Sequence, residues 1–341
     1  MPAARRLTRG RALLLAALFA LSGAALITPS ATASAAAAAA ESASGQNGAE
    51  ELRWVRLDKL HPTQGAVGHD QVHYKLGRYA STKDEDRGKF NKKYDDWCEA
   101  NGQGEAASVR AHARLDKPGR FSCTIPEGQE TADSVAAMKT VVVGPRDRLY
   151  LTDGHHTFTS FWETPDGGPK TKIRVRVAAD LSHLDKKEFW AEMEQRGWVW
   201  LRDGGGRKIT ADQLPGRLGL DRLDDDPYRA LVYFTRDIGY QKPAKPVEFL
   251  EFYWGAWLRD DLRLSLDDYD LDDHADYLRL VEDASRAMVA LPGTTELADG
   301  RTADGLGRLA TWNAKEFAKL STPMADAKPG KLAYALNHRL R

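Results

Sequence analysis

Five consecutive residues, Asp153 to Thr157, combine a carboxylate, a glycine, two imidazoles and a hydroxyl. A β-branched stretch precedes them and a helical pattern follows, so we expect a strand that ends at Asp-Gly and passes into a helix. Such a helix start presents free backbone N–H groups and the positive end of the helix dipole, and both favour anions. Imidazoles can donate or accept protons near neutral pH. We therefore interpret the segment as a site that recognises or cleaves a phosphate ester.

Each residue of this segment has an expected role. His155 or His156 would act as general acid or base, and Asp153 would orient one imidazole or stabilise its charged form. Gly154 would let the backbone approach a ligand closely, and Thr157 would offer its hydroxyl. A divalent metal held by Asp153 and a histidine is a further hypothesis, although its ligand set is incomplete.

A structural interpretation competes with this functional one. Asp153 fits the N-cap position of the helix, where aspartate is favoured in any protein. Neighbouring residues on a helix point about 100° apart. One of His155 and His156 would then face the site while the other packs or caps.

The elements that must position this segment follow from hydrophobic periodicity and turn residues. A hairpin is expected in front of it, with strands at 139–143 and 149–151, and a helix at 155–163 and a strand at 172–178 are expected behind it. Upstream, the pattern predicts a strand over 51–60, a turn at His61-Pro62 and a helix over 71–79. Downstream, a capping box at Asp185 begins a helix that Gly197 ends, and Gly204 to Gly206 predict a hairpin turn. Four later helices are predicted at 228–238, 247–259, 273–290 and 311–320.

Residues 139–145 and 149–157 resemble the ParB-like nuclease family of the ParB/sulfiredoxin superfamily. Leu60 to Gln64 resembles the first conserved block of that family, and Asp226 to Arg229 and Glu251 to Trp254 resemble its helical C-terminal half. The resemblance covers most of residues 52 to 260. It implies an α+β fold: a ParB/sulfiredoxin-like domain at 51–180 with a small mixed sheet, followed by a mainly helical region at 181–341.

The resemblance also implies ligand-binding roles for Gln64 and Lys75. A lysine beside an anion site neutralises a phosphate as a point charge. The competing interpretations are a solvated helix face for Lys75 and a turn-stabilising side chain for Gln64. Sulfiredoxin has a catalytic cysteine after the glycine and ParB has nucleotide-gripping arginines nearby. Neither follows Gly154, so we expect neither sulfinic-acid reduction nor nucleotide-triphosphate binding.

The N-terminus predicts export. Residues 1–35 combine a basic start, an apolar run and small residues typical of a signal peptide, and 36–50 have the composition of a disordered leader. The general secretory route and the twin-arginine route both stay open, and so does the cleavage site. In an oxidising compartment, Cys98 and Cys123 would form one structural disulfide. We expect a secreted protein of the extracellular space or cell envelope.

Composition and charge limit the classes of partner that the chain is expected to bind. The chain has 49 basic and 49 acidic residues, and cleavage of the signal peptide would remove four arginines and no acids, which leaves a net charge of −4. That balance argues against a stable nucleic-acid complex but allows brief contact with a nucleic-acid substrate. No stretch after the leader is apolar enough for a membrane span. The sequence therefore predicts an exported hydrolase acting on a phosphodiester or nucleic acid. The alternatives are a non-catalytic module that binds a phosphorylated or anionic ligand, and a structural protein with a vestigial site.

Overall fold

A five-stranded mixed sheet supports the predicted site in the computed structural model, which describes residues 51–245, 247–298 and 300–341. The predicted signal peptide and leader lie outside these residues. The strands are ordered β1-β8-β6-β7-β2. Their bounds are Leu52–Arg56 (β1), Leu60–Pro62 (β2), Thr140–Gly144 (β6), Arg148–Leu151 (β7) and Lys172–Asp180 (β8).

The predicted hairpin at the centre of this sheet is confirmed. β6 and β7 are antiparallel, with Val141 opposite Leu151 and Val143 opposite Leu149. β8 pairs with β6 and β2 pairs with β7, both in parallel. The valine run of β6 is buried on both faces, as expected for a strand covered on two sides. The parallel β2–β7 pair brings the end of the first conserved block next to the end of β7.

Three local predictions differ from the structure. The stretch predicted as one strand over 51–60 is divided by a 3₁₀ helix at Leu57–Lys59, and His61-Pro62 belongs to β2 and not to a turn. The reason is tertiary: β2 pairs with β7, and the Thr63 hydroxyl donates a hydrogen bond to the Leu151 carbonyl at 2.7 Å. The hairpin expected around Gly204 to Gly206 reduces to a single bridge between Arg202 and Lys208.

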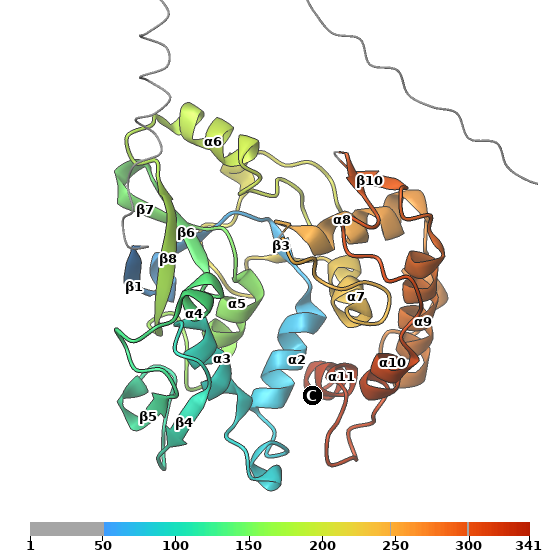
Figure 1. Ribbon diagram of the computed structural model, residues 1–341, viewed down its shortest axis with the longest axis horizontal. Coiled ribbons are helices and arrows are strands. Elements are labelled where there is room, and N and C mark those ends of the chain that lie inside the picture. The colour runs from blue at the N-terminus through green and yellow to red at the C-terminus, as the bar shows by residue number, and fades with distance from the viewer. Residues whose placement is uncertain (1–50, 246, 299) are drawn as a thin grey trace, which may run out of the picture. The chain divides into compact units, whose positions relative to one another are not determined.

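Helices pack against the sheet, and one of them carries a cysteine of the disulfide. α2 (His69–Tyr79) packs against α5 (His155–Glu163), which begins at the predicted site (Figure 1). The segment between α2 and β6 holds α3 (Lys92–Ala100), α4 (Ala132–Ala136) and a small β4–β5 hairpin (Ala106–Val109 and Phe121–Cys123). Cys98 of α3 is joined to Cys123 of β5, as expected, with their Cα atoms 5.6 Å apart.

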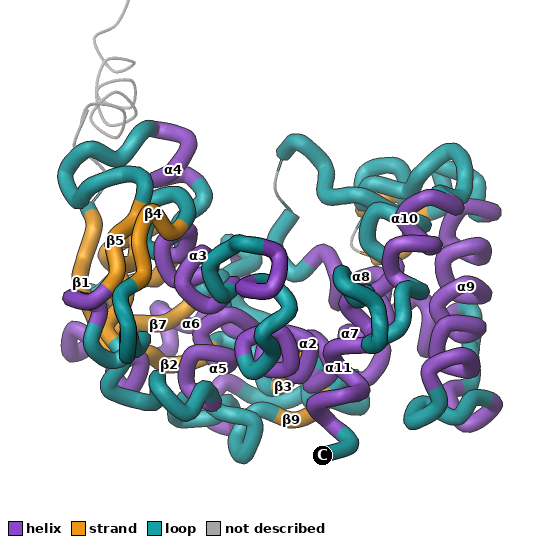
Figure 2. Tube along the Cα trace, turned by 90° about the horizontal axis from the view of Figure 1, so that it is seen from below, coloured by secondary structure: helices purple, strands orange, loops and turns teal. Residues whose placement is uncertain are grey.

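The C-terminal half is mainly helical, which confirms the α+β class. Figure 2 shows the sheet strands gathered on one side and α8, α9 and α10 on the other. The helices are α6 (Lys186–Gln195), α7 (Pro227–Thr235), α8 (Leu250–Ala256) with a π-helical turn (Trp257–Asp261), α9 (His274–Ala290), α10 (Ala314–Leu320) and α11 (Lys331–Arg339). Short strand pairs join β3 (Ala66–Val67) to β9 (Asp224–Asp225) and β10 (Glu296–Ala298) to β11 (Arg301–Thr302). Asp185 forms the predicted capping box with Glu188. No helix within the described ranges is long and apolar enough to cross a bilayer.

The last helix, α11, has no counterpart in the sequence prediction, and it packs along α2. Gly77 of α2 makes this approach close: a Cβ built there would lie 2.2 Å from the Tyr334 carbonyl oxygen of α11. The described residues belong to one compact unit, so contacts cross the boundary expected near Leu181. The end of the chain therefore braces the helix that carries Lys75.

We predict that Gly77→Ala lowers the free energy of unfolding by about 1–3 kcal/mol, because an added methyl would force α2 and α11 apart. Gly216→Ala is the matched control, since a Cβ at this exposed glycine meets nothing within 4 Å. Urea titration followed by tryptophan fluorescence measures both. Equal stability of the two variants would show that the close approach of the helices contributes little.

Candidate functional site

The predicted site lies where β7 ends and α5 begins. Thr152 still belongs to the ladder, donating its N–H to the Thr140 carbonyl at 2.9 Å. Gly154 then adopts a left-handed conformation, with φ at +100°, and occupies the N-cap of α5. Its carbonyl accepts the first helical hydrogen bond, from Phe158 N–H at 2.9 Å. The interpretation of Asp153 as the N-cap is therefore wrong, and its carboxylate is available for another partner.

That partner is Lys139, at the start of the hairpin. Lys139 Nζ lies 2.9 Å from Asp153 Oδ2. The lysine stem folds over Gly154, where a Cβ would lie 2.7 Å from Lys139 Cγ. The attraction of Asp153 raises the pKa of Lys139. Burial works against ionisation of Asp153, but the charge of Lys139 and its hydrogen bond prevail and lower the pKa of that carboxyl.

Both histidines are buried, and each accepts a hydrogen bond from the segment that follows β2. Thr63 N–H donates to His155 Nε2 at 3.1 Å, and Gly68 N–H donates to His156 Nε2 at 3.1 Å. An acceptor nitrogen carries no proton, so the hydrogen bonds assign the Nδ1–H tautomer to both rings. Asp153 makes no hydrogen bond to either ring within the described part of the chain. The expected orienting contact is replaced by its pair with Lys139.

This arrangement keeps both imidazoles neutral. Burial lowers the pKa of His155 to about 3, although the charge of Asp153 acts in the opposite direction. Burial also lowers the pKa of His156 far below its usual value, and the charge of Arg229 adds to that effect. Protonation at Nε2 would break the hydrogen bond from the backbone. The geometry thus favours a positioning role for the rings over the cationic form that a general acid needs.

A polar cavity of about 220 Å³ opens beside the turn, and all the predicted site residues line it. They are Gln64, Lys75, Asp153, Gly154, His155, His156 and Thr157. Five cationic side chains line the same cavity: Lys75, Lys139, Arg229, Arg236 and Lys242. Three carboxylates accompany them: Asp153, Glu248 and Glu251. The lining therefore carries an excess of positive charge.

The arginines and two of the acids come from α7, α8 and the segment between them, which the sequence analysis did not assign to the site. Glu251 is buried and pairs with Arg236, and Arg229 Nη2 lies 3.6 Å from it. Burial opposes ionisation of Glu251, but Arg229 and Arg236 prevail and lower its pKa. Arg229 also donates to Gln71 on α2 at 3.0 Å. The blocks 226–229 and 251–254 supported the family resemblance, and that signal could have identified these residues.

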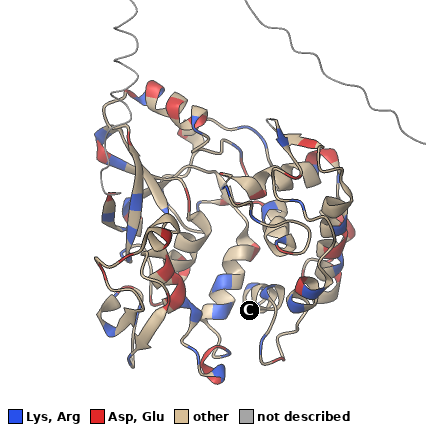
Figure 3. Cartoon of the chain, viewed as in Figure 1, with Lys and Arg blue, Asp and Glu red and all other residues tan. Residues whose placement is uncertain are grey.

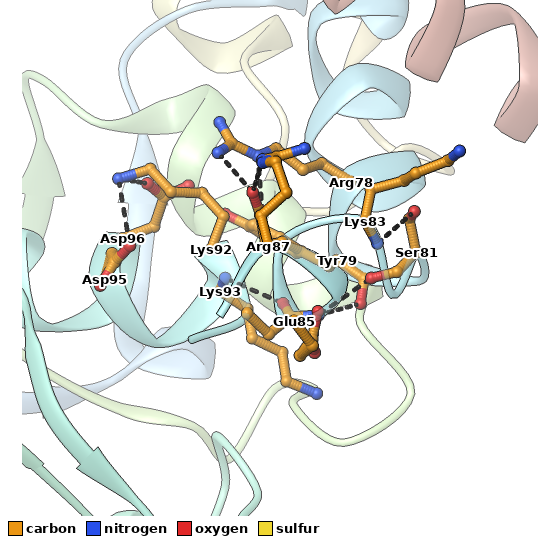
Figure 4. Close-up of polar contacts among 12 residues, drawn as sticks. Arg78, Tyr79, Ser81, Lys83, Glu85, Arg87, Lys92, Lys93, Asp95 and Asp96 are labelled. Carbon is orange, nitrogen blue, oxygen red and sulfur yellow. Dashed lines mark hydrogen bonds and ion pairs between the residues drawn. The ribbon is translucent and has the colours of Figure 1, made fainter. Parts of the chain in front are cut away.

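The two residues assigned by resemblance reach the cavity with partners of their own. Gln64 is 3% exposed and donates its amide to the Ala66 carbonyl at 2.6 Å, so it stabilises the turn as well as lining the cavity. Lys75 Nζ lies 2.7 Å from Asp96 Oδ2. Burial opposes ionisation of Asp96, but Lys75 and Lys92 lower its pKa to about 2. Figure 4 shows Lys92 directed at the same carboxylate on α3.

The donor set does not fit a resident metal ion. Across the described residues, no three His, Cys, Asp or Glu side chains come together as metal ligands would. Near the turn, both Nε2 atoms accept backbone N–H groups and Asp153 pairs with an ammonium group. We therefore derive no catalytic step through a protein-held metal.

The fold and the cavity define an α+β protein with an anion-favouring helix start at the end of a hairpin. The chain belongs to the family described as "Putative ParB-like nuclease", whose model matches residues 53–260. This match confirms the resemblance inferred from the sequence. Among solved structures, protein Atu1540 from Agrobacterium tumefaciens is similar, at 24% identity over 70% of this chain and 93% of that chain, with a TM-score of 0.45. No curated protein matches the chain.

Because His155 and His156 are buried and neutral, we predict that the folded chain loses stability in acid. Above their ordinary pKa of 6.5 the folded and unfolded rings are both neutral, so they add no pH dependence there. Below 6.5 the unfolded chain takes up protons that the folded chain does not. Stability is then lost as the pH falls toward 4, by up to about 1.4 kcal/mol per pH unit for each ring.

Urea titrations between pH 4 and 8 measure this slope. His155→Asn should lose about 1–3 kcal/mol at pH 7.5, because it weakens the acceptor for Thr63 N–H, and its slope below pH 6.5 should be shallower. The control is His183→Asn, which changes an exposed histidine. A wild-type slope in the His155 variant would contradict the neutral, buried assignment.

Proposed function

We propose that the polar cavity binds the phosphoryl group of a phosphodiester, and that the chain is a nuclease-like hydrolase of phosphodiester or nucleic-acid substrates. The family supports a nuclease-like role in general terms. The observation that carries the finer proposal is the position of Lys139, whose ammonium group lies against Asp153 at the start of α5 and lines the cavity.

The helix start supplies the neutral donors for such an anion. Within the described chain, no carbonyl or side chain accepts the backbone N–H groups of His155, His156 or Thr157. Together with the helix dipole, these groups favour a phosphate oxygen. The space that a side chain at Gly154 would fill is taken by the Lys139 stem, which brings the lysine to the helix start. Arg229 adds a spare donor at the same cavity, because its buried Nε has no acceptor in the described residues.

The carboxylates offer acid–base groups that the histidines do not. Asp153 is about half exposed (53%), and its lowered pKa keeps it ionised, so it can accept a proton from an attacking water. Glu248 lines the same cavity, and burial together with the charge of Asp153 raises its pKa. Two carboxyl groups whose pKa values are driven apart suit a base and an acid in hydrolysis. In this proposal, His155 and His156 fix the Asp-Gly-His-His segment through their Nε2 atoms. Their Nδ1–H groups then face the ligand or the solvent.

The second candidate is a non-catalytic module that binds a phosphorylated or anionic ligand. One observation favours it: both imidazoles are committed to backbone hydrogen bonds and are neutral. The cavity would then retain its anion affinity without turnover. Acidic and basic residues are intermixed over the fold (Figure 3), so in either case we expect brief contact with nucleic acid and no stable complex.

Two substitutions at the ion pair separate these candidates. Lys139→Gln should weaken binding of inorganic phosphate or a dinucleotide about tenfold, because a charge-assisted contact is lost. Asp153→Asn should strengthen phosphate binding, because it removes the internal carboxylate that competes for Lys139. If the chain is a hydrolase, Asp153→Asn and Glu248→Gln should also lower turnover of bis(p-nitrophenyl) phosphate and single-stranded oligonucleotides.

Calorimetry and product assays, run with a panel of divalent metals, give these readouts. Lys187→Gln is the control, since this exposed lysine lies on α6 away from the cavity. Phosphate binding without hydrolysis in every metal would select the module. Unchanged phosphate binding in Lys139→Gln would eliminate both candidates.

We also propose that the protein is exported. The basic and apolar N-terminus supports this, and so does the Cys98–Cys123 disulfide, because such bonds persist in oxidising compartments. Expression of the full chain in a secreting bacterial host should release a product that begins between about residues 32 and 40. Mass spectrometry of the culture fluid identifies that terminus. Retention of Met1 inside the cells would contradict the proposal.

A further inference from the structure

A second and larger cavity, of about 420 Å³, lies among α2, α7, α10 and α11. These helices contact one another around it, and Figure 1 shows them grouped together. The cavity is lined by residues from each helix and from the segment 322–330 that leads into α11. Most of it lies outside the predicted phosphodiester site, with Arg236 as the residue that lines both cavities.

The walls of this second cavity are largely aromatic and aliphatic. Tyr74, Phe234 and Tyr334 contribute rings, and Ile238 and Leu320 contribute aliphatic surface. The Tyr74 ring centroid lies 6.3 Å from that of Tyr334 and 5.9 Å from that of Tyr233. An apolar enclosure of this size matches the sites that hold small organic ligands. Its rings suit an aromatic body, which packs against them edge-on or offset.

The polar part of the lining is strongly basic. Six cationic side chains and two carboxylates line it: Arg78, Arg87, Arg236, Lys319, Lys328 and Lys331, with Asp237 and Glu316. Several of the cations already have partners. Arg78 and Arg87 both pair with Asp84, and Figure 4 shows the two guanidinium groups converging. Arg236 pairs with Glu251 and Lys319 with Glu316.

Lys331, at the start of α11, is a half-buried cation of this lining that has no carboxylate partner in the part of the chain that the structure describes. Within the described chain, no carboxylate lies at ion-pairing distance from its ammonium group, which sits 5.0 Å from the Tyr233 ring centroid. Burial, reinforced by the charge of Arg236, lowers the pKa of Lys331, although the charges of Asp237 and Glu316 act in the opposite direction. A partly desolvated cation that has no carboxylate in direct contact is costly, and a bound anion would relieve that cost.

We propose that this cavity binds a small aromatic monoanion, with its ring against Tyr74, Phe234 and Tyr334 and its carboxylate at Lys331. The cavity volume sets the size of the ligand, and the ring-lined wall selects its aromatic body. The half-buried ammonium group of Lys331, which has no ion pair among the described residues, sets its charge. This site is independent of phosphodiester binding, because its ammonium group and its rings do not line the polar cavity.

Calorimetry with 2-naphthoate, and with neutral 2-naphthalenemethanol as the matched ligand, tests the proposal on the oxidised mature chain. The wild type should bind naphthoate more tightly than the alcohol. Lys331→Gln should weaken naphthoate binding about tenfold and leave alcohol binding unchanged, because only the charged contact is removed. Lys331→Arg should keep naphthoate binding. Lys315→Gln is the control, since this exposed lysine of α10 lies outside the cavity.

A cavity-filling variant guards against indirect effects. Thr322→Trp places a bulky ring in the cavity lining and should abolish binding of both ligands while circular dichroism stays native. Lys139→Gln should leave naphthoate binding intact even if phosphate binding fails, so the two sites are tested separately. The proposal is overturned if the wild type does not bind naphthoate. It is equally overturned if Lys331→Gln has no effect, if that variant weakens both ligands equally, or if Lys139→Gln is the variant that abolishes binding.

Discussion

The structure depends on two hydrogen bonds in which buried imidazoles accept backbone N–H groups. Thr63 and Gly68 flank the segment between β2 and α2, and His155 and His156 open α5. Each ring nitrogen satisfies a donor that burial would otherwise leave without a partner, at a cost of about 1–3 kcal/mol each. The two bonds fasten the first conserved block to the Asp-Gly-His-His turn. They therefore determine where Gln64 and Lys75 stand relative to the start of α5.

This constraint changes the chemistry expected of the turn. A histidine that accepts a buried N–H is held neutral, so the titrating groups nearest the helix start are Lys139, Asp153 and Glu248. The charged side chains that line the cavity are already paired with one another before a ligand binds. The chief pairs are Lys139 with Asp153 and Arg236 with Glu251. Internal pairing stabilises the empty site. A bound anion would therefore replace the carboxylate partner of a lysine or arginine, because these cations are not free.

The two cavities differ in the side chains that line them. Backbone N–H groups and charged side chains surround the smaller cavity, which suits a compact and strongly hydrated anion such as phosphate. Rings and aliphatic side chains surround the larger one, which suits an apolar body with a single charge. Arg236 stands on the wall between them and is tied to Glu251, so its position is set from the polar side. The apolar cavity is completed by α10, α11 and the segment between them, which lie beyond the family match, while α2 and α7 lie within it.

The sequence alone determined the features that depend on neighbouring residues. The β6–β7 hairpin, α5 from His155 to Glu163, the capped α6 and the disulfide all follow from local periodicity, turn residues and cysteine count. The family resemblance added the α+β class and drew attention to Gln64 and Lys75, both of which line the polar cavity. The division of the 51–60 strand and the existence of α11 depend on long-range packing, which local patterns do not encode.

Only the tertiary structure decided what the motif residues do. Which atom an imidazole offers, and whether it is charged, depend on burial and on the N–H groups of Thr63 and Gly68, about ninety residues away in sequence. The pairing of Asp153 with Lys139 required the hairpin to close, and Arg229, Arg236 and Glu251 entered the cavity through the packing of α7 and α8. Residue types indicate which chemistry a segment could perform. The dielectric environment and the neighbours from distant segments determine the protonation state and the partner of each side chain.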